Sequence, residues 1–264
     1  MNNVDAILIA AFGTTVAPAR EAYTRFDHAV KERFEKKEVR WAYTSSRVRA
    51  KLARQGICSE SVEEALAGLA EDGYRKIAVL PLQVIPGVEY DIILKETDSF
   101  LSTNEVESVS AVVGKPLLSD FEDTCRVAWA LLDDAPKKRE EADALIFMGH
   151  GSARHSSDFF YTALAAFLID LDKRAFLGTV EGELTIDDVV RRCKEACCKK
   201  AWLIPFMAVA GDHAVNDMAG EGEDSWKSIL SREGIEGIPI QRGVLDNAGI
   251  REVWLDHLAE VILC

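Results

Sequence analysis

Two of the five histidines lie in glycine-rich turns that directly follow apolar segments. His150 lies in the segment MGHGS (148–152), and His213 lies in AGDHA (210–214). Glycine removes side-chain bulk and lets the backbone turn sharply, so we expect both imidazoles to be exposed to a bound molecule. A neutral imidazole binds borderline divalent metals such as cobalt, iron, nickel and zinc, and with a pKa of about 6.5 it also takes up protons at neutral pH. The two histidines therefore indicate a metal site or a proton-accepting site.

Two carboxylates are placed to complete such a site. Glu181 ends an expected strand over 176–181, and Glu89 follows an apolar strand and a glycine turn. We expect Glu181 to complete a three-ligand set with the two histidines, which leaves a metal position open for exchange. Glu89 belongs to the other half of the chain, where an acid would accept or relay protons without binding metal. For each glutamate, a solvated loop carboxylate is the alternative.

The other three histidines are weaker candidates. His28 and His257 fall within expected helices, where surface or packing roles are favoured. His155 follows the first glycine turn, and its sequence favours neither a functional nor a structural role.

Other kinds of catalytic centre lack their motifs. Ser152 is not in a G-x-S-x-G nucleophile turn, and no arginine precedes His150 as in an Arg-His-Gly trio. No glycine-rich phosphate-binding loop occurs, so we expect a reaction without nucleotide. Cys193 and Cys197 lie one helical turn apart, but no other ligand type is near, and packing on a helix is favoured over a metal site.

The elements that carry these residues occur twice in the chain. Residues 77–81 are followed after a constant interval by Gly87 and Glu89, and residues 201–205 by Gly211 and His213. Upstream, residues 7–14 resemble 144–150. The match indicates two related halves in which Thr14 and Glu89 take the places of His150 and His213.

Apolar runs alternate with segments of helical periodicity, which is typical of βαβ units and mainly parallel sheets. We expect an α/β fold with two similar lobes, residues 1–136 and 137–264, joined near the polar segment 134–139. Ligands bind at the carboxyl ends of strands in such sheets, so the polar turns should surround an active-site cleft between the lobes. The expected strands are 5–12, 38–44, 76–82, 106–113, 143–148, 176–181, 200–206 and 238–241; the expected helices are 17–36, 47–55, 61–72, 88–103, 120–133, 156–171, 186–198, 224–232 and from 247 onward.

Composition restricts the partners. The net charge of −13 argues against nucleic acid or an anionic membrane as the main partner. The chain has neither a basic leader nor an apolar run of about 18 residues, so we expect a cytoplasmic protein with free cysteines. A basic cluster, Arg47, Arg49 and Lys51, is where a polycarboxylate would find compensating charge, although a solvated helix face is the alternative.

The motifs together resemble those of the single-subunit cobaltochelatases of the anaerobic cobalamin pathway, a class II chelatase family. The likeness covers essentially the whole chain, and its most specific stretches are MGHG (148–151) and AGDHAVNDM (210–218). It is also carried by the segments AFGTT (11–15), TSS (44–46), GVEY (87–90) and VE (180–181).

The resemblance implies a bilobal chelatase-like fold and insertion of Co²⁺ into sirohydrochlorin, an acidic tetrapyrrole, without ATP. His150, Glu181 and His213 match the family's metal ligands, and Glu89 matches an acid that faces the macrocycle. His150 is the expected principal base, with Glu89 as a relay. Fe²⁺ insertion leading to siroheme stays open, as do a homo-oligomer, a tetrapyrrole or metal carrier without catalysis, and a metal-dependent hydrolase.

Overall fold

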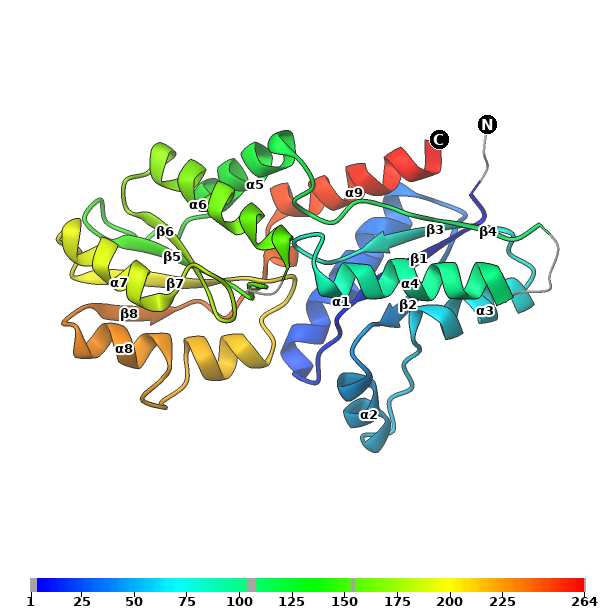
Figure 1. Cartoon of the computed structure of the whole chain (residues 1–264), viewed down its shortest axis with the longest axis horizontal. Coiled ribbons are helices and arrows are strands. Elements are labelled where there is room, and N and C mark those ends of the chain that lie inside the picture. The colour runs from blue at the N-terminus through cyan, green and yellow to red at the C-terminus, as the bar shows by residue number, and fades with distance from the viewer. Residues whose placement is uncertain (1–3, 104–107, 153–154, 264) are drawn as a thin grey trace. The chain divides into compact units, whose positions relative to one another are not determined.

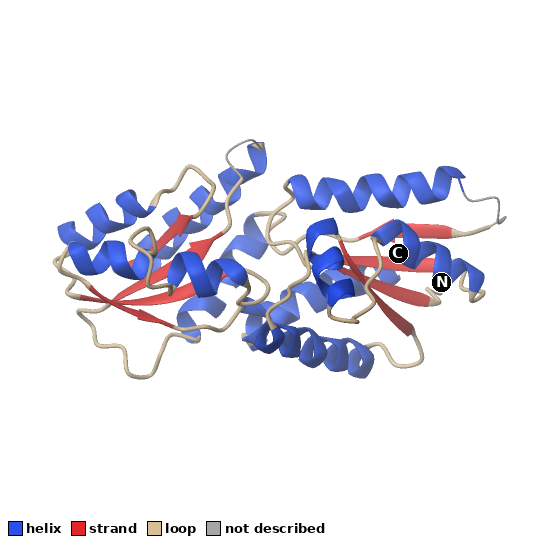
Figure 2. Ribbon diagram, turned by 90° about the horizontal axis from the view of Figure 1, so that it is seen from below, coloured by secondary structure: helices blue, strands red, loops and turns tan. Residues whose placement is uncertain are grey.

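The computed structural model describes residues 4–103, 108–152 and 155–263. The chain forms two compact units. Unit 1 combines Met1–Ser119 with Glu252–Cys264, and unit 2 is Asp120–Arg251. Each unit contains a four-stranded parallel sheet with helices on both faces (Figures 1 and 2). The predicted fold class, two α/β lobes with parallel sheets, is confirmed.

Unit 1 has the strand order β2-β1-β3-β4. The central strand β1 reads AILIAA and is buried along its whole length, as expected of a parallel strand covered on both faces. Alternate residues of β1, such as Leu8, pack with Leu66 of α3 and Ile93 of α4. The elements of this unit are β1 (Ala6–Ala11), α1 (Ala17–Arg33), β2 (Glu38–Tyr43), α2 (Ser46–Arg54), α3 (Val62–Glu71), β3 (Lys76–Pro81), α4 (Val88–Thr103), β4 (Ser110–Val113) and most of α9 (Ala248–Leu263).

Unit 2 repeats this arrangement with the strand order β6-β5-β7-β8. Ile146 and Met148 of β5 pack with Val189 of α7 and Trp226 of α8. The elements are α5 (Phe121–Asp133), β5 (Ala144–Gly149), a 3-10 helix (Ser156–Asp158), α6 (Phe159–Leu171), β6 (Ala175–Thr179), α7 (Ile186–Glu195), β7 (Lys200–Phe206), a π-helix (Ala214–Met218), α8 (Trp226–Arg232), β8 (Glu236–Pro239) and a 3-10 helix (Val244–Asp246).

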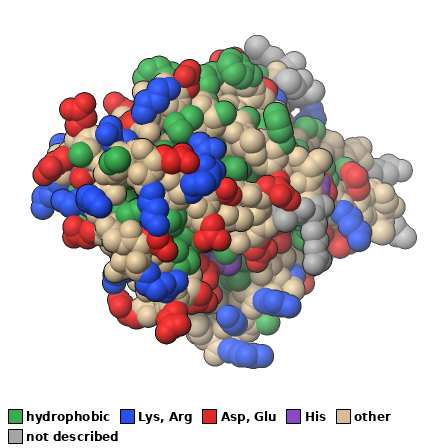
Figure 3. Space-filling view, turned by 60° about the vertical axis from the view of Figure 1, so that its left-hand side comes forward, with side chains coloured by type: hydrophobic (Ala, Val, Ile, Leu, Met, Phe, Trp, Pro, Cys, Tyr) green, Lys and Arg blue, Asp and Glu red, His purple; other side chains and the backbone are tan. Residues whose placement is uncertain are grey.

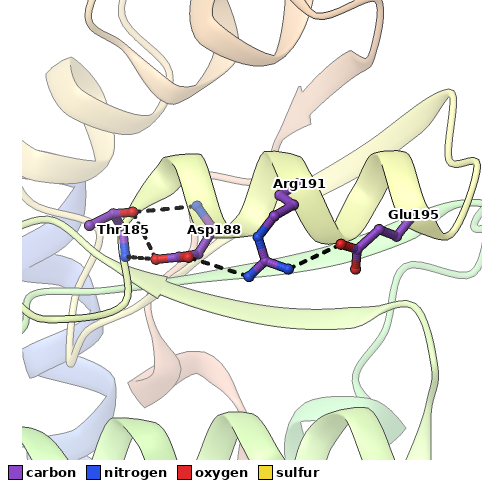
Figure 4. A network of polar contacts seen from close by, with 4 residues as sticks. All are labelled: Thr185, Asp188, Arg191 and Glu195. Carbon is purple, nitrogen blue, oxygen red and sulfur yellow. Dashed lines mark hydrogen bonds and ion pairs between the residues drawn. The ribbon is translucent and has the colours of Figure 1, made fainter.

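The start of α7 is fixed by a capping box. The Thr185 hydroxyl accepts from the Asp188 backbone N–H, while the Asp188 carboxylate accepts from the Thr185 backbone and hydroxyl. Arg191 then links Asp188 to Glu195 along the helix (Figure 4). This cap ends the loop that carries Glu181.

The first unit boundary differs from the predicted one between residues 136 and 137, because α5 belongs to unit 2. Phe121 of α5 packs edge-on against Phe167 of α6, with 6.0 Å between the ring centroids. The carbonyl of Ala130 accepts a hydrogen bond of 2.8 Å from the Asn247 side chain. The proline-containing segment 134–139 therefore lies inside unit 2 and is not a linker.

The second difference is that unit 1 contains the later part of the chain's last helix. Arg33 of α1 pairs with Glu252 at 2.9 Å and with Asp256 at 2.6 Å. The ring of Phe26 meets Trp254 edge-on at 6.4 Å. Sequence periodicity indicates which face of a helix is buried but not which element covers it, so the packing of the last helix against unit 1 was not predicted.

Most expected elements are present with ends shifted by a few residues. Of the expected strand over 106–113, β4 covers Ser110–Val113, and residues 104–107 lie outside the described part of the chain. Within the described part, no helix combines the length and apolar character needed to span a membrane.

Candidate functional site

Strand registers define which turns of the two units are equivalent. In unit 1, β1 pairs with Tyr43 through Ala11 and with Pro81 through Ala10. In unit 2, Gly149 and Met148 make the same pairings, to Thr179 and Pro205 respectively. Glu89 and His213 then lie at the same distance after their prolines, as the sequence repeat predicts.

The predicted equivalence of Thr14 with His150 is wrong. The register places Phe12 one residue after Ala11, where unit 2 has His150 one residue after Gly149. Gly13 and Gly151, the next residues, both have positive φ, +91° and +84°. The sequence match shifted because unit 2 has a glycine on each side of His150, and Gly13 was matched to Gly149 instead of Gly151. Unit 1 thus presents a half-exposed phenylalanine where unit 2 presents an imidazole.

His150 is partly exposed and immediately follows β5. Its Nδ1 lies 3.0 Å from the carbonyl oxygen of Gly151. A carbonyl only accepts hydrogen bonds, so Nδ1 carries the proton and donates it. The lone pair is therefore on Nε2, which is the nitrogen available to a metal or a proton.

His213 has the same arrangement with a different acceptor. Its Nδ1 donates to Oδ2 of Asp217 at 2.6 Å, one turn later in the π-helix that begins at Ala214. Metal-binding histidines usually donate their second ring nitrogen to a carboxylate or carbonyl in this way. The ring centroids of His150 and His213 are 4.8 Å apart with an interplanar angle of 83°. The structure thus brings together two imidazoles that are 63 positions apart in the sequence.

Glu181 reaches this pair through its backbone. Its N–H donates to the His150 carbonyl at 2.8 Å, and the N–H of Val180 donates to Gly149 at 3.0 Å, so the β5–β6 ladder continues past both strands. The Glu181 side chain is exposed. Among the residues that the structure describes, no three His, Cys, Asp or Glu side chains are gathered to hold a metal. The Glu181 carboxylate therefore does not join the two rings in this structure.

Glu89 lies in the first turn of α4 in unit 1. Its Oε2 accepts a hydrogen bond of 2.6 Å from the hydroxyl of Thr44, which is buried. The guanidinium of Arg49 in turn donates to the carbonyls of Tyr43 and Thr44. Arg49 is thus engaged with the backbone, which corrects its expected role as a free cation of the basic cluster.

The other three histidines and the cysteine pair lie outside the His150–His213 site. His155 caps a 3-10 helix by accepting from the Ser157 N–H, His257 is buried in α9, and His28 is exposed on α1. Cys193 is buried and Cys197 exposed, and burial raises the pKa of the Cys193 thiol to about 12.

Comparison with known proteins identifies the family of this chain. The sequence model for cobalt chelatase (CbiK) matches residues 5–263. The chain belongs to the cobalt chelatase (CbiK) family.

Curated members cover most of the chain. Sirohydrochlorin cobaltochelatase CbiKC from Nitratidesulfovibrio vulgaris is 37% identical over 97% of this chain and 90% of that protein. The sirohydrochlorin cobaltochelatase of Salmonella typhimurium is 32% identical over 84% of this chain and 82% of that protein. Among solved structures, SirB from Bacillus subtilis with Fe³⁺ shares the fold, with a TM-score of 0.67, 16% identity, and coverage of 97% of this chain and 94% of that one.

Sequence reasoning missed the residues that hold the candidate ligands in place. Asp217 had only a weak signal: it lies four positions after His213, the spacing of one helical turn, but no helix was predicted there. Thr44 was noted only as part of a motif, and its bond to Glu89 spans 45 positions, which no local pattern reports.

Proposed function

We propose that this protein inserts Co²⁺ into sirohydrochlorin without nucleotide, as the names of its curated relatives describe for them. The observation that carries the proposal is the His150–His213 pair in a chain of the cobalt chelatase family, with each Nδ1 engaged by an acceptor and neither Nε2 hydrogen-bonded to any described residue. Two neutral imidazoles are good ligands for Co²⁺ and for Fe²⁺.

We assign the incoming metal ion to His150, His213 and Glu181. The two imidazoles bind first through Nε2, and the carboxylate of Glu181 turns toward them as the third ligand. The backbone contact between the two residues supports this assignment, because the Glu181 N–H donates a hydrogen bond to the carbonyl of His150. Three protein ligands leave an open position toward the tetrapyrrole, and an open site releases its ion where a closed cage would retain it.

The proton balance gives His150 a second role. Sirohydrochlorin loses two pyrrole protons as it takes up a divalent ion, so a base must be present when the metal leaves its protein ligands. Departure of the ion frees the Nε2 lone pair of His150, which then accepts one pyrrole proton. Glu89, oriented by Thr44, relays the other to solvent.

The test is spectrophotometric turnover of sirohydrochlorin with Co²⁺, Fe²⁺ and Ni²⁺ in parallel, for the wild type and for His150→Ala and His213→Ala. Removing an acid–base or ligand group should lower kcat with Co²⁺ by about 100-fold or more. His28→Ala, on the exposed face of α1, is the matched control and should turn over normally.

Each other outcome selects a different function. Unchanged turnover in both variants would refute the assignment of the histidines. Tight binding of sirohydrochlorin without turnover would indicate a carrier, and hydrolysis of esters or phosphates alone would indicate a metal-dependent hydrolase. Faster turnover with Fe²⁺ than with Co²⁺ would make siroheme formation the main activity.

A further inference from the structure

A buried carboxylate lies behind the two loops that carry His150 and Glu181. Asp158 ends the 3-10 helix before α6, and its relative exposure is only 6%. Its Oδ1 accepts from the backbone N–H of Ser152 at 2.7 Å, and its Oδ2 accepts from the N–H of Glu183 at 3.0 Å. Each carboxylate oxygen thus binds one loop, two residues beyond a proposed metal ligand.

The two loops are in backbone contact where Asp158 binds them. A side chain on Gly151 would overlap the backbone of Gly182, and Gly151 also has a φ of +84°. A Cβ on Gly182 would lie 2.5 Å from Oγ1 of Thr179 and 2.6 Å from Oδ1 of Asp158. Both positions therefore require glycine, and the absence of side chains lets the carboxylate bind both loops at once.

We infer that Asp158 is a positioning residue that fixes the Glu181 loop against the His150 loop and so sets the spacing of these two metal ligands. The inference deepens the proposed function and rests on its ligand assignment. We do not place Asp158 among the metal ligands, because it is buried and each of its oxygens already accepts from a backbone N–H. Groups that orient metal ligands from behind typically contribute about 10- to 100-fold to metal affinity.

Asp158→Asn tests this role with little change of shape. The amide keeps one acceptor oxygen but turns an NH₂ group toward the other backbone N–H, so one loop loses its partner. We expect the dissociation constant for Co²⁺, titrated without tetrapyrrole, to rise by about 10- to 100-fold. The visible absorption of bound Co²⁺ should also shift, because it reports the ligand geometry, while KM for sirohydrochlorin stays close to that of the wild type.

Asp143→Asn is the matched control. Asp143 is also a buried carboxylate of unit 2, and it accepts from the N–H of Glu140 and from the indole of Trp202, each at 3.1 Å. It precedes β5, whereas His150 follows that strand. We expect Asp143→Asn to lower thermal stability without changing Co²⁺ affinity. Equal effects of the two variants on Co²⁺ affinity would overturn the inference.

Two further variants separate the inference from the proposed function. If His150→Ala and Glu181→Gln leave Co²⁺ binding intact, the ligand assignment fails and the positioning role fails with it. If both weaken Co²⁺ binding and Asp158→Asn does not, only the positioning role is overturned. Should Asp158→Asn not fold, Asp158→Glu keeps the negative charge but moves the carboxylate, and it should reproduce the loss of Co²⁺ affinity. If neither folds while Asp143→Asn does, the contact serves folding alone and the inference is overturned.

Discussion

Each histidine of the candidate metal pair has one ring nitrogen bonded to an oxygen that can only accept. The carbonyl of Gly151 and the carboxylate of Asp217 fill this role for His150 and His213 respectively. These bonds select the same tautomer in both rings, with a free Nε2. The rings are therefore oriented before a metal arrives, which reduces the conformational freedom lost on binding.

Asp217 offers the first residue-level prediction. Asp217→Ala removes the acceptor of the His213 Nδ1–H, so the ring is free to change tautomer and orientation. We expect Co²⁺ affinity to fall by about 10- to 100-fold, as measured by titration with Co²⁺. Asp212→Ala is the control, because its carboxylate accepts from Asn216 and, among the described residues, makes no hydrogen bond to the His213 ring. Equal Co²⁺ affinity in the two variants would contradict an orienting role for Asp217.

The candidate histidines could be predicted because a glycine turn after an apolar strand is a local pattern. The two rings lie 4.8 Å apart between centroids, and Glu181 was chosen as the third ligand because it ends an expected strand, a choice that the resemblance to chelatases also implies. Asp158 could not be predicted, because its partners lie 6 and 25 positions away and meet only after two strands have paired.

At the scale of elements, α2 is a basic helix with one buried residue, Leu52. It begins two residues after Thr44, the partner of Glu89. Arg47, Lys51 and Arg54 are exposed, and no hydrogen bond or ion pair within the described residues engages them. In a protein of net charge −13 this is a local surplus of positive charge, suited to the carboxylates of the tetrapyrrole.

We predict that the double variant Arg47→Ala/Lys51→Ala raises KM for sirohydrochlorin while kcat changes little. Exposed ion pairs contribute about 0.2–1 kcal/mol each, so two should raise KM roughly 2- to 30-fold. The effect should shrink at high salt, because exposed charges are screened. Steady-state kinetics at two salt concentrations measure both. The double variant Lys137→Ala/Lys138→Ala changes the net charge equally on an exposed part of unit 2 and should leave KM unaltered; an equal rise there would show a nonspecific charge effect.

The order of strands and helices was predictable, because apolar runs and helical periodicity alternate along the chain. Two element features were not. The π-helix Ala214–Met218 after His213 is too short to show periodicity. The turns after β1 and β5 were misaligned in the sequence comparison. The strand registers show that Phe12 is the positional equivalent of His150, and such registers are set by pairing with neighbouring strands and not by local sequence.

At the scale of the whole molecule, acidic and basic side chains are interspersed on the face shown in Figure 3. The resolved shifts of carboxyl groups all lower the pKa. For Asp143, burial raises the pKa, but hydrogen bonds from Glu140 and Trp202 together with the nearby charges of Lys200 and Arg139 lower it further, so the net shift is downward. For Asp188, the hydroxyl of Thr185 contributes most. The same direction holds for Glu64, Asp172, Glu221 and Glu233.

These shifts predict acid sensitivity. A carboxyl group whose pKa is lowered by folding stabilises the folded protein at pH values above the pKa of the same group in the unfolded chain, which is about 3.9 for Asp and 4.3 for Glu. This contribution is lost as the pH falls through the pKa of the folded state. We expect the free energy of unfolding to decline steeply below about pH 4. Denaturant unfolding monitored over a pH series measures it. Asp143→Asn should flatten the decline; a slope identical to that of the wild type would contradict a contribution from this group.

The division into units has a consequence for how the polypeptide acquires its structure during synthesis. Unit 2 is one uninterrupted stretch, whereas unit 1 gains Trp254, Glu252 and Asp256 only after all of unit 2 has left the ribosome. The half bearing the two imidazoles can therefore complete its sheet while α1 still lacks the ring that covers Phe26. The N-terminal half of the nascent chain thus emerges first and is finished last.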